Sequence, residues 1–325
     1  MKKIFSYIFL LVSFFSCEKE SKKFLVETIS IDADYRLNDI YFIDKNIGFA
    51  TGGDKYDEGY ILMTEDGGVS WLRVPDSSIF SNSDISLQTL YSIDFFNDSI
   101  GQVVGHGGKI LRTENGGKNW DLIRHGSWEN FHDLKMFSAE KTLLISGGAY
   151  GGGQYFWSED KWFYFNVEEE IYALRDLEFL DNNIGYSAGF GFVKKTIDGG
   201  LTWNILDLKD DYFFDIHFPS SDVGYICGWQ GGIYKTTDAG KNWKNVHPIN
   251  VAFSKRYHFE NIHFINNDIG LVCSTNGELL YTKNGGEKWF EIETNTNSSF
   301  HSLYFLNETT AFVGGNNGTL LRINL

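Results

Sequence analysis

The stretch TEDGGVSW at residues 64–71 decides how this chain folds, because it returns four times. Every copy has a Thr, an Asp or Asn two residues later, a Gly two residues after that, and a closing Trp. The further copies are TENGGKNW at 113–120, TIDGGLTW at 196–203, TTDAGKNW at 236–243 and TKNGGEKW at 282–289. With a weaker copy, WSEDKW at 157–162, the closing tryptophans are spaced by 40 to 49 residues. A period near 40 residues with several short strands is typical of a β-propeller blade.

Each repeat contains four segments with strand character. In residues 213–246 they are FFDIHF, VGYICG, IYKT and WKNV, separated by polar or glycine-rich turns. The same order recurs at 40–74, 90–123, 131–167, 174–207 and 259–292. The last unit, 300–325, has three strands, and FLVETISI at 24–31 can supply the fourth. The sequence therefore predicts an all-β, seven-bladed β-propeller of four-stranded antiparallel blades, closed by the N-terminal strand, which leaves no open sheet edge.

The repeated motif falls at the turn between the third and fourth strands, where its residue types suit a structural role. Asp and Asn accept hydrogen bonds from turn N–H groups, glycines adopt positive φ, and the Trp buries a large ring. Asn replaces Asp in two copies, which a turn tolerates and an acid catalyst does not. The residues interpreted as structural are Asp66, Trp71, Asn115, Trp120, Asp198, Trp203, Asp238, Trp243, Asn284 and Trp289.

These motifs resemble the Asp-box repeats of bacterial neuraminidases. The segments IGFATG, IGQVVG, IGYSAG, VGYICG and IGLVCS, followed by T-x-D-G-G-x-x-W, are most similar to one branch of that group, the photosystem II assembly factors of plants and cyanobacteria. The resemblance covers about residues 24–325 and implies a seven-bladed propeller. An Asn- and Lys-rich lipoprotein is not expected to be photosynthetic, so the resemblance does not transfer that family's partner.

The N-terminus resembles a bacterial lipoprotein signal peptide, which we assign to residues 1–16. Lys2 and Lys3 precede a mainly apolar segment, 4–15, that is too short to span a bilayer. Cys17 is then the expected lipidation site, 17–23 a tether and 24–325 the propeller. This arrangement predicts an outer-membrane lipoprotein of the cell envelope, facing either the periplasm or the surface. An ordinary secreted protein is the alternative.

The formal net charge of −15 limits the partners of the chain. Such a charge repels nucleic acid and anionic lipid, so no nucleic-acid partner is expected and membrane contact is assigned to the N-terminal lipid alone. We expect a monomer that binds an envelope protein or a glycan.

Enzymatic motifs are weak. A sialidase needs an arginine cluster, but the seven arginines are scattered, and YRLN at 35–38 only half matches the Phe/Tyr-Arg-Ile-Pro motif. No catalytic residue, cofactor or metal is assigned, although a pair of carboxylates at the channel mouth stays open. His217 and His263 occupy equivalent positions in DIHF and NIHF, where packing beside the channel is favoured over metal binding. The sequence favours a non-catalytic, lipid-anchored scaffold or assembly factor; the alternative is a sialidase-like surface glycoside hydrolase acting at the channel mouth.

Two groups of residues are candidates for partner binding. Aromatic residues in the loops of one face could anchor a partner, or each could pack on its own blade. They are Tyr56, Phe80, Trp128, Tyr150, Tyr155, Phe190, Trp229 and Tyr257. The second group consists of cations that directly precede the repeated Thr, or its equivalent in the last unit, and should ring the opposite face. They are Arg112, Lys195, Lys235 and Arg322, which either pair with neighbouring blades or receive an acidic partner segment.

Overall fold

The structure is a computed structural model, and it describes residues 24–54, 58–75, 88–124, 130–148, 151–158, 161–165, 173–247 and 258–325. The predicted signal peptide and tether, with Cys17, lie outside the described residues. So do five of the candidate loop aromatics: Tyr56, Phe80, Trp128, Tyr150 and Tyr257.

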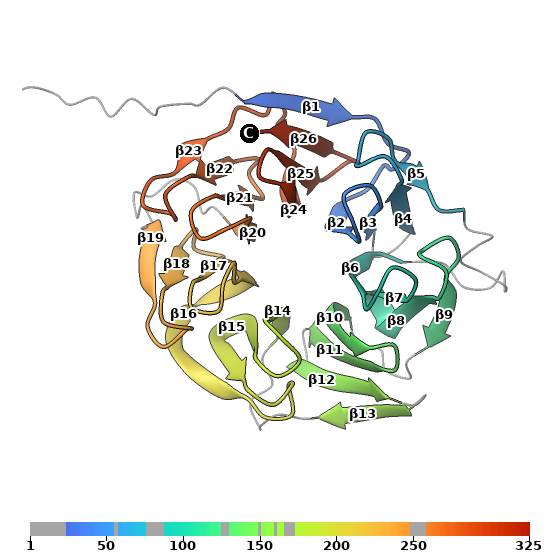
Figure 1. The fold of residues 1–325 in the computed structure, drawn as a ribbon, viewed down its shortest axis with the longest axis horizontal. Helices are drawn as coiled ribbons and strands as arrows, with labels where there is room; N and C mark the ends of the chain where they lie inside the picture. Colours follow the sequence, from blue (N-terminus) through green and yellow to red (C-terminus); the bar gives the residue numbers. More distant parts are fainter. Residues whose placement is uncertain are drawn as a thin grey trace, which may run out of the picture.

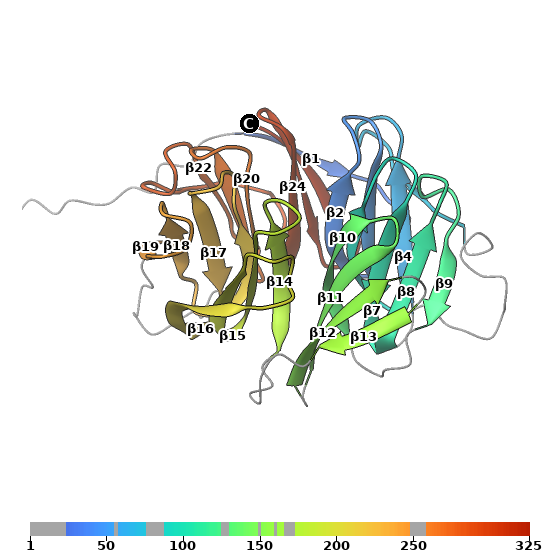
Figure 2. The same cartoon turned by 60° about the horizontal axis from the view of Figure 1, so that its bottom comes forward.

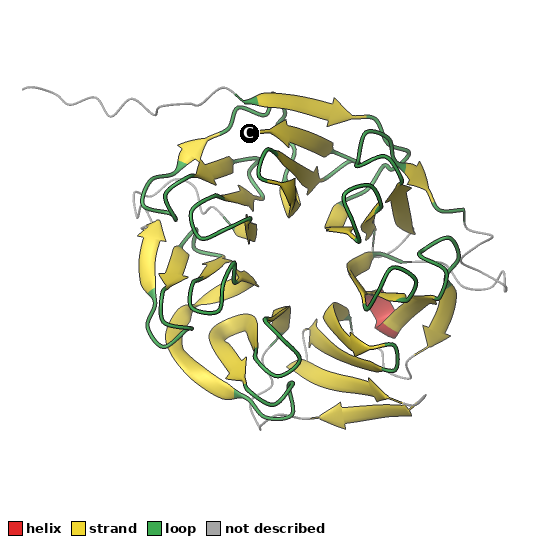
Figure 3. Ribbon diagram, viewed as in Figure 1, coloured by secondary structure: helices red, strands yellow, loops and turns green. Residues whose placement is uncertain are grey.

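Antiparallel sheets arranged around a common axis make up most of the described chain (Figures 1 and 3). The prediction of an all-β fold of four-stranded antiparallel sheets is confirmed. Four of the sheets run outward from the axis in chain order. They comprise β2 (Leu37–Phe42), β3 (Gly48–Gly53), β4 (Gly59–Thr64) and β5 (Leu72–Arg73); β6 (Leu90–Phe95), β7 (Gly101–Gly105), β8 (Lys109–Thr113) and β9 (Asp121–Arg124); β10 (Phe131–Ser138), β11 (Lys141–Gly148), β12 (Gly151–Ser158) and β13 (Lys161–Phe165); and β20 (Phe259–Phe264), β21 (Gly270–Ser274), β22 (Leu279–Thr282) and β23 (Phe290–Glu291).

A six-stranded sheet follows β13 in the chain. Its strands, in order, are β14 (Leu174–Phe179), β15 (Gly185–Thr196), β16 (Asn204–His217), β17 (Gly224–Gly228), β18 (Ile233–Thr236) and β19 (Lys244–His247). β16 pairs with β15 through its first part and with β17 through its last part. The interval between the predicted repeats 174–207 and 213–246 is strand throughout, because β16 runs from Asn204 to His217. Phe190 pairs with Tyr212 and Phe192 with Lys209, on either side of Gly191, whose φ of 78° is in the left-handed region.

The first and last strands of the chain share a sheet. β1 (Leu25–Ile29) pairs with β26 (Leu320–Asn324) in a register that joins Leu25 to Asn324 and Ile29 to Leu320 (Figure 1). β25 (Thr310–Gly315) and β24 (Phe300–Asn307) complete this sheet toward the axis. The helical element of the described residues is the 3-10 turn η2 (His106–Gly108), and none of those residues forms an apolar helix of membrane-spanning length.

The core lies within and between the sheets, which stand beside one another around the axis (Figure 2). The glycine that begins the second strand of most repeats is required there. A Cβ on Gly48 would lie 2.6 Å from the ring of Phe42, and one on Gly270 would lie 2.5 Å from the ring of Phe264. The glycine of the repeated Ile-Gly or Val-Gly is therefore explained by close packing of its backbone against the aromatic ring that ends the innermost strand.

Candidate functional site

The T-x-D-x-G-x-x-W motif is hydrogen-bonded within itself. In the fourth copy, Thr236 Oγ1 donates to Asp238 Oδ1 (2.9 Å) and accepts from the N–H of Gly240 (3.0 Å). Asp238 Oδ1 also accepts from the N–H of Asn242 (2.8 Å), and Trp243 Nε1 donates to the Gly240 carbonyl (3.1 Å). The bond from the Thr hydroxyl to the Asp or Asn recurs at Asp66, Asn115, Asp198 and Asn284. These side chains are engaged in their own turns, each in a separate repeat.

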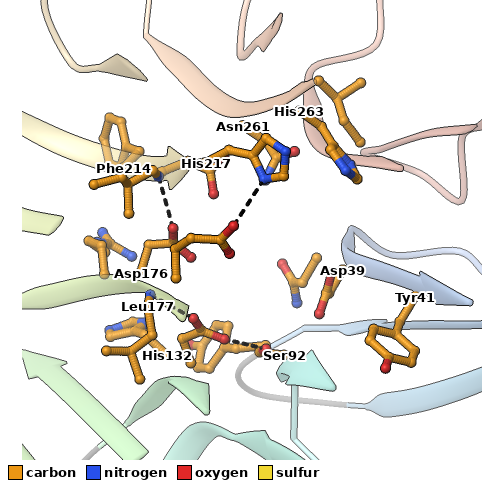
Figure 4. A pocket seen from close by; sticks show the side chains of 18 of the residues that line it. Asp39, Tyr41, Ser92, His132, Asp176, Leu177, Phe214, His217, Asn261 and His263 are labelled. Carbon is orange, nitrogen blue, oxygen red and sulfur yellow. Dashed lines mark hydrogen bonds and ion pairs between the residues drawn. The ribbon is translucent and has the colours of Figure 1, made fainter. Parts of the chain in front are cut away.

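The innermost strands place polar side chains around an axial cavity of about 330 Å³ (Figure 4). Their common pattern is apolar-x-polar-apolar-x-apolar, as in LNDIYF of β2 and LRDLEF of β14. The third position holds Asp39, Ser92, Asp133, Asp176, Asp215, Asn261 and Ser302. Sequence reasoning missed this set, although the small polar residue recurs in every innermost strand.

The aspartates of this set join each innermost strand to the next. Asp133 Oδ2 accepts from the N–H of Leu177 (2.8 Å). Equivalent bonds run from Ile93 to Asp39 (3.0 Å), from Ile216 to Asp176 (2.8 Å) and from Ile262 to Asp215 (2.6 Å). These carboxyl groups satisfy backbone N–H groups that would otherwise be buried without partners.

Burial raises the pKa of these carboxyl groups. It raises the pKa of Asp39 to about 6 and that of Asp215 to about 8. The pKa values of Asp133 and Asp176 are raised as well, first by burial and then by a neighbouring carboxyl group. Carboxyl groups do converge in the channel, as the glycosidase alternative requires, but they accept hydrogen bonds from the backbone of neighbouring innermost strands.

The end of the channel nearer the repeated motif is lined by the fifth residues of the innermost strands. His217 Nε2 lies 2.9 Å from the Phe264 carbonyl, its Nδ1 lies 3.5 Å from Glu178, and its ring centroid is 4.5 Å from that of His263. Burial lowers the pKa of His217 to about 4 and that of His263 to about 3, so both are neutral at pH 7. No group of three or more His, Cys, Asp and Glu within the described ranges could hold a metal ion.

The opposite, loop end of the channel carries the second residues of the innermost strands. Arg175 and Phe214 are two of them, and Glu260 is a third. Arg36, just before β2, lies 3.9 Å from Glu260, and His301 Nδ1 lies 3.9 Å from the same carboxylate. We call this end the loop-end mouth.

An aromatic row lies beside the loop-end mouth. We define it as Phe190, Tyr212, Phe214, Trp229 and His258. Successive ring centroids along the row are 4.1 to 6.2 Å apart. Phe190 is 52% exposed and Trp229 is 39% exposed. Two predicted loop aromatics, Phe190 and Trp229, therefore lie on one surface, joined by Tyr212 and Phe214, which were not among the predicted residues.

Tyr155 is a correction among the candidate loop aromatics. It lies in β12, is only 4% exposed, and packs edge-on against Phe131 with ring centroids 5.2 Å apart. The glycine-rich segment before it pairs with β11 rather than forming a long loop, so the side chain enters the core.

Three of the four predicted ring cations turn toward the next blade. Lys195 Nζ donates to the Ala239 carbonyl (3.0 Å), Lys235 Nζ to the Gly285 carbonyl (2.9 Å) and Arg112 Nη1 to the Ala139 carbonyl (2.9 Å). The Nε of Arg322 is buried without a hydrogen-bond partner. These three cations contact backbone carbonyls of the neighbouring repeat.

The family model of the photosynthesis system II assembly factor YCF48 matches residues 18–127 and 201–297, well over half of the chain. The chain belongs to the YCF48 family. The resemblance predicted from the Asp-box segments is therefore confirmed.

Known proteins of the YCF48 family resemble this chain in sequence and in structure. The photosystem II assembly lipoprotein Ycf48 of Synechococcus sp. (strain CC9902) is 33% identical over 95 residues, which span 27% of this chain and 28% of the relative. A solved structure of YCF48 bound to D1 peptide superposes with a TM-score of 0.73 at 20% identity and covers 92% of this chain and 97% of that one. YCF48 from Cyanidioschyzon merolae has the same TM-score at 16% identity, with 92% and 98% covered. These likenesses establish a β-propeller.

Proposed function

We propose that this chain is a non-catalytic scaffold or assembly factor that binds a segment of a partner protein at the loop-end mouth. The observation that carries the proposal is the aromatic row, whose Phe190 and Trp229 are exposed beside the axial cavity. Exposed aromatics next to a concave surface are typical binding anchors. A relative of the same family, YCF48, has been solved with a bound peptide, which supports a protein segment as the occupant.

The proposal includes a ring of seven blades, closed by β1. β16 is long enough to end one blade and begin the next, so the six-stranded sheet accounts for two blades. The pairing of β1 with β26 then supplies the outer strand of the last blade. Both features support the count predicted from the repeat.

The proposal also places the protein in the cell envelope, held by a lipid on Cys17. The signal-like pattern of residues 1–16 supports this, and the curated Synechococcus relative is a lipoprotein by name. A glycoside hydrolase is the less favoured reading, because Asp39, Asp133, Asp176 and Asp215 are engaged by the backbone of neighbouring strands.

The test is a pull-down from native envelope with the chain tagged after Leu325. The parent is compared with a Phe190→Ala, Trp229→Ala double variant and with Leu72→Ala, a control that removes an exposed apolar side chain (74% exposed) elsewhere. The expected result is a protein retained by the parent and by Leu72→Ala and lost from the double variant, with equal melting temperatures. Retention by the parent and both variants, or no enriched protein, would overturn the proposal.

A further inference from the structure

Arg175 is held in place by the aromatic row. Its Nε donates to the hydroxyl of Tyr212 (2.7 Å), and its guanidinium carbon lies 5.3 Å from the ring centroid of Tyr212 and 5.5 Å from that of Phe214. Stacking on two rings and one hydrogen bond fix the orientation of a side chain that is otherwise flexible. The two terminal nitrogens, Nη1 and Nη2, take no part in that hydrogen bond.

Arg175 has no carboxylate within ion-pair distance among the residues that the structure describes. Glu260 at the loop-end mouth is shared by Arg36 and His301. Burial opposes the charged form of Glu260, but His301, Arg36 and, more weakly, Arg175 lower its pKa. An unpaired guanidinium is notable in a chain with a formal net charge of −15, where carboxylates are plentiful. A planar guanidinium with two free nitrogens matches a carboxylate in a bidentate pair.

The rings next to Arg175 form a stacking surface. The planes of Tyr212 and Trp229 differ by 12°, and those of Phe214 and Trp229 by 23°. Nearly parallel, rigid aromatic rings accept flat apolar groups such as proline and aromatic side chains. The pairing of Phe190 with Tyr212 in β15 and β16 holds this part of the row on extended strands.

We infer that the loop-end mouth selects an acidic, ring-bearing peptide segment, with a carboxylate on Arg175 and a proline or aromatic residue on Trp229. This inference rests on the proposed function and names the chemistry of its partner. The carboxylate can belong to an Asp or Glu side chain or to the C-terminus of the partner.

The test selects binders from a random peptide library with free C-termini, against the parent chain and against Arg175→Gln, Arg175→Lys and Trp229→Ala. Peptides from the parent should be enriched in acids, or end in a required carboxylate, next to Pro, Phe, Tyr or Trp. Each should bind Arg175→Gln about tenfold more weakly. Arg175→Lys should recover only part of the affinity, because an ammonium lacks the planar fork. Peptides selected on Arg175→Gln should keep the preference for rings and lose the preference for acids.

Resynthesised peptides separate the two sources of the carboxylate. An amidated C-terminus abolishes binding if the terminal carboxylate is used, and Asp→Asn or Glu→Gln abolishes it if a side chain is used. Selected peptides without an acid preference, equal binding to Arg175→Gln, or no enrichment from the library would each overturn the inference. The envelope pull-down is independent of it, since a protein lost from the Phe190, Trp229 double variant but retained by Arg175→Gln would leave the proposed function standing and reject this partner chemistry.

Discussion

At the scale of single residues, the five copies of the motif can be compared to show which backbone conformation the turn requires. The residue after the Asp or Asn is Gly in four copies, with φ between 65° and 72°, and Ala239 in the copy at 236–243, with φ of 59°. A side chain in this left-handed region costs about 1–2 kcal/mol, partly offset by the greater freedom of glycine in the unfolded chain.

We therefore expect Ala239→Gly to raise the free energy of unfolding by about 0.5–1 kcal/mol. Denaturant unfolding of the variant and the parent measures this difference. The matched control is the reverse change, Gly199→Ala, which should lower the free energy of unfolding, since Gly199 has φ of 72°. Equal stability of all three chains would contradict the strain argument.

The buried hydroxyl of Thr236 gives a second prediction at this scale. Thr236→Val keeps the shape but leaves the N–H of Gly240 without its acceptor, so unfolding should become easier by about 1–3 kcal/mol. Thr236→Ser retains the hydroxyl and serves as the control, with the smaller loss expected. Thermal unfolding of the two variants measures the difference in stability. A valine variant as stable as the serine variant would refute the role of the hydroxyl.

Residue contacts within a turn could be predicted from the sequence, and contacts between sheets could not. Thr236, Asp238 and Gly240 lie within four residues of one another, so their spacing already specifies their hydrogen bonds. Asp215 bonds to Ile262, 47 residues away. Its role depends on the position of the neighbouring innermost strand, which the local sequence pattern does not predict. Arg175 and Tyr212 meet for the same reason, 37 residues apart.

At the scale of elements, the innermost strands make stability depend on pH. Burial raises the pKa of Glu178 to about 7 and that of Asp215 to about 8, whereas unfolded carboxyl groups titrate near pH 4. The folded state therefore binds more protons than the unfolded state up to about pH 8, and its stability falls as pH rises through these values. The buried histidines, with lowered pKa values, oppose this trend only below about pH 6.5.

The free energy of unfolding should therefore drop between about pH 6.5 and 8.5, on the order of 1–2 kcal/mol. Asp215→Asn, which stays neutral and keeps an acceptor for Ile262, should flatten this drop. The exposed Asp121→Asn variant is the control and should leave the slope unchanged. Urea unfolding across this pH range measures the slopes, and parallel profiles for Asp215→Asn and the parent would refute the prediction.

The elements themselves were predicted well where the repeat is regular and poorly where it is not. The alternation in FFDIHF and the turn residues of PSSD placed the strands from 213 onward correctly. The continuity of β16 between two repeats was missed, because residues 208–212 are mostly charged and linker-like. Their pairing with β15, Phe190 with Tyr212 and Phe192 with Lys209, keeps them in the strand.

At the scale of the whole molecule, β1 should stabilise the fold more than a strand of five residues usually does. It covers the outer edge of β26 along five residue pairs, from Leu25 with Asn324 to Ile29 with Leu320. A chain that begins at Asp32 leaves that edge open, and an exposed edge strand favours association between copies.

We expect the chain that begins at Asp32 to melt at least about 5 °C lower than one that begins at Phe24, and to form larger species at high concentration. Scanning calorimetry and light scattering measure the two effects. The chain that begins at Phe24 is the control, because it retains β1 intact. Equal melting temperatures and sizes would show that β1 does not stabilise the molecule.

The pairing of β1 with β26 also sets an order of events during synthesis. Leu25 is among the first residues of the propeller to leave the ribosome, and its partner Asn324 lies in β26, the last of the described strands. The sheets between them contain near neighbours in sequence and can form as they emerge, whereas contacts between distant residues form slowly. The first strand must therefore remain without its final partner until β26 has been synthesised.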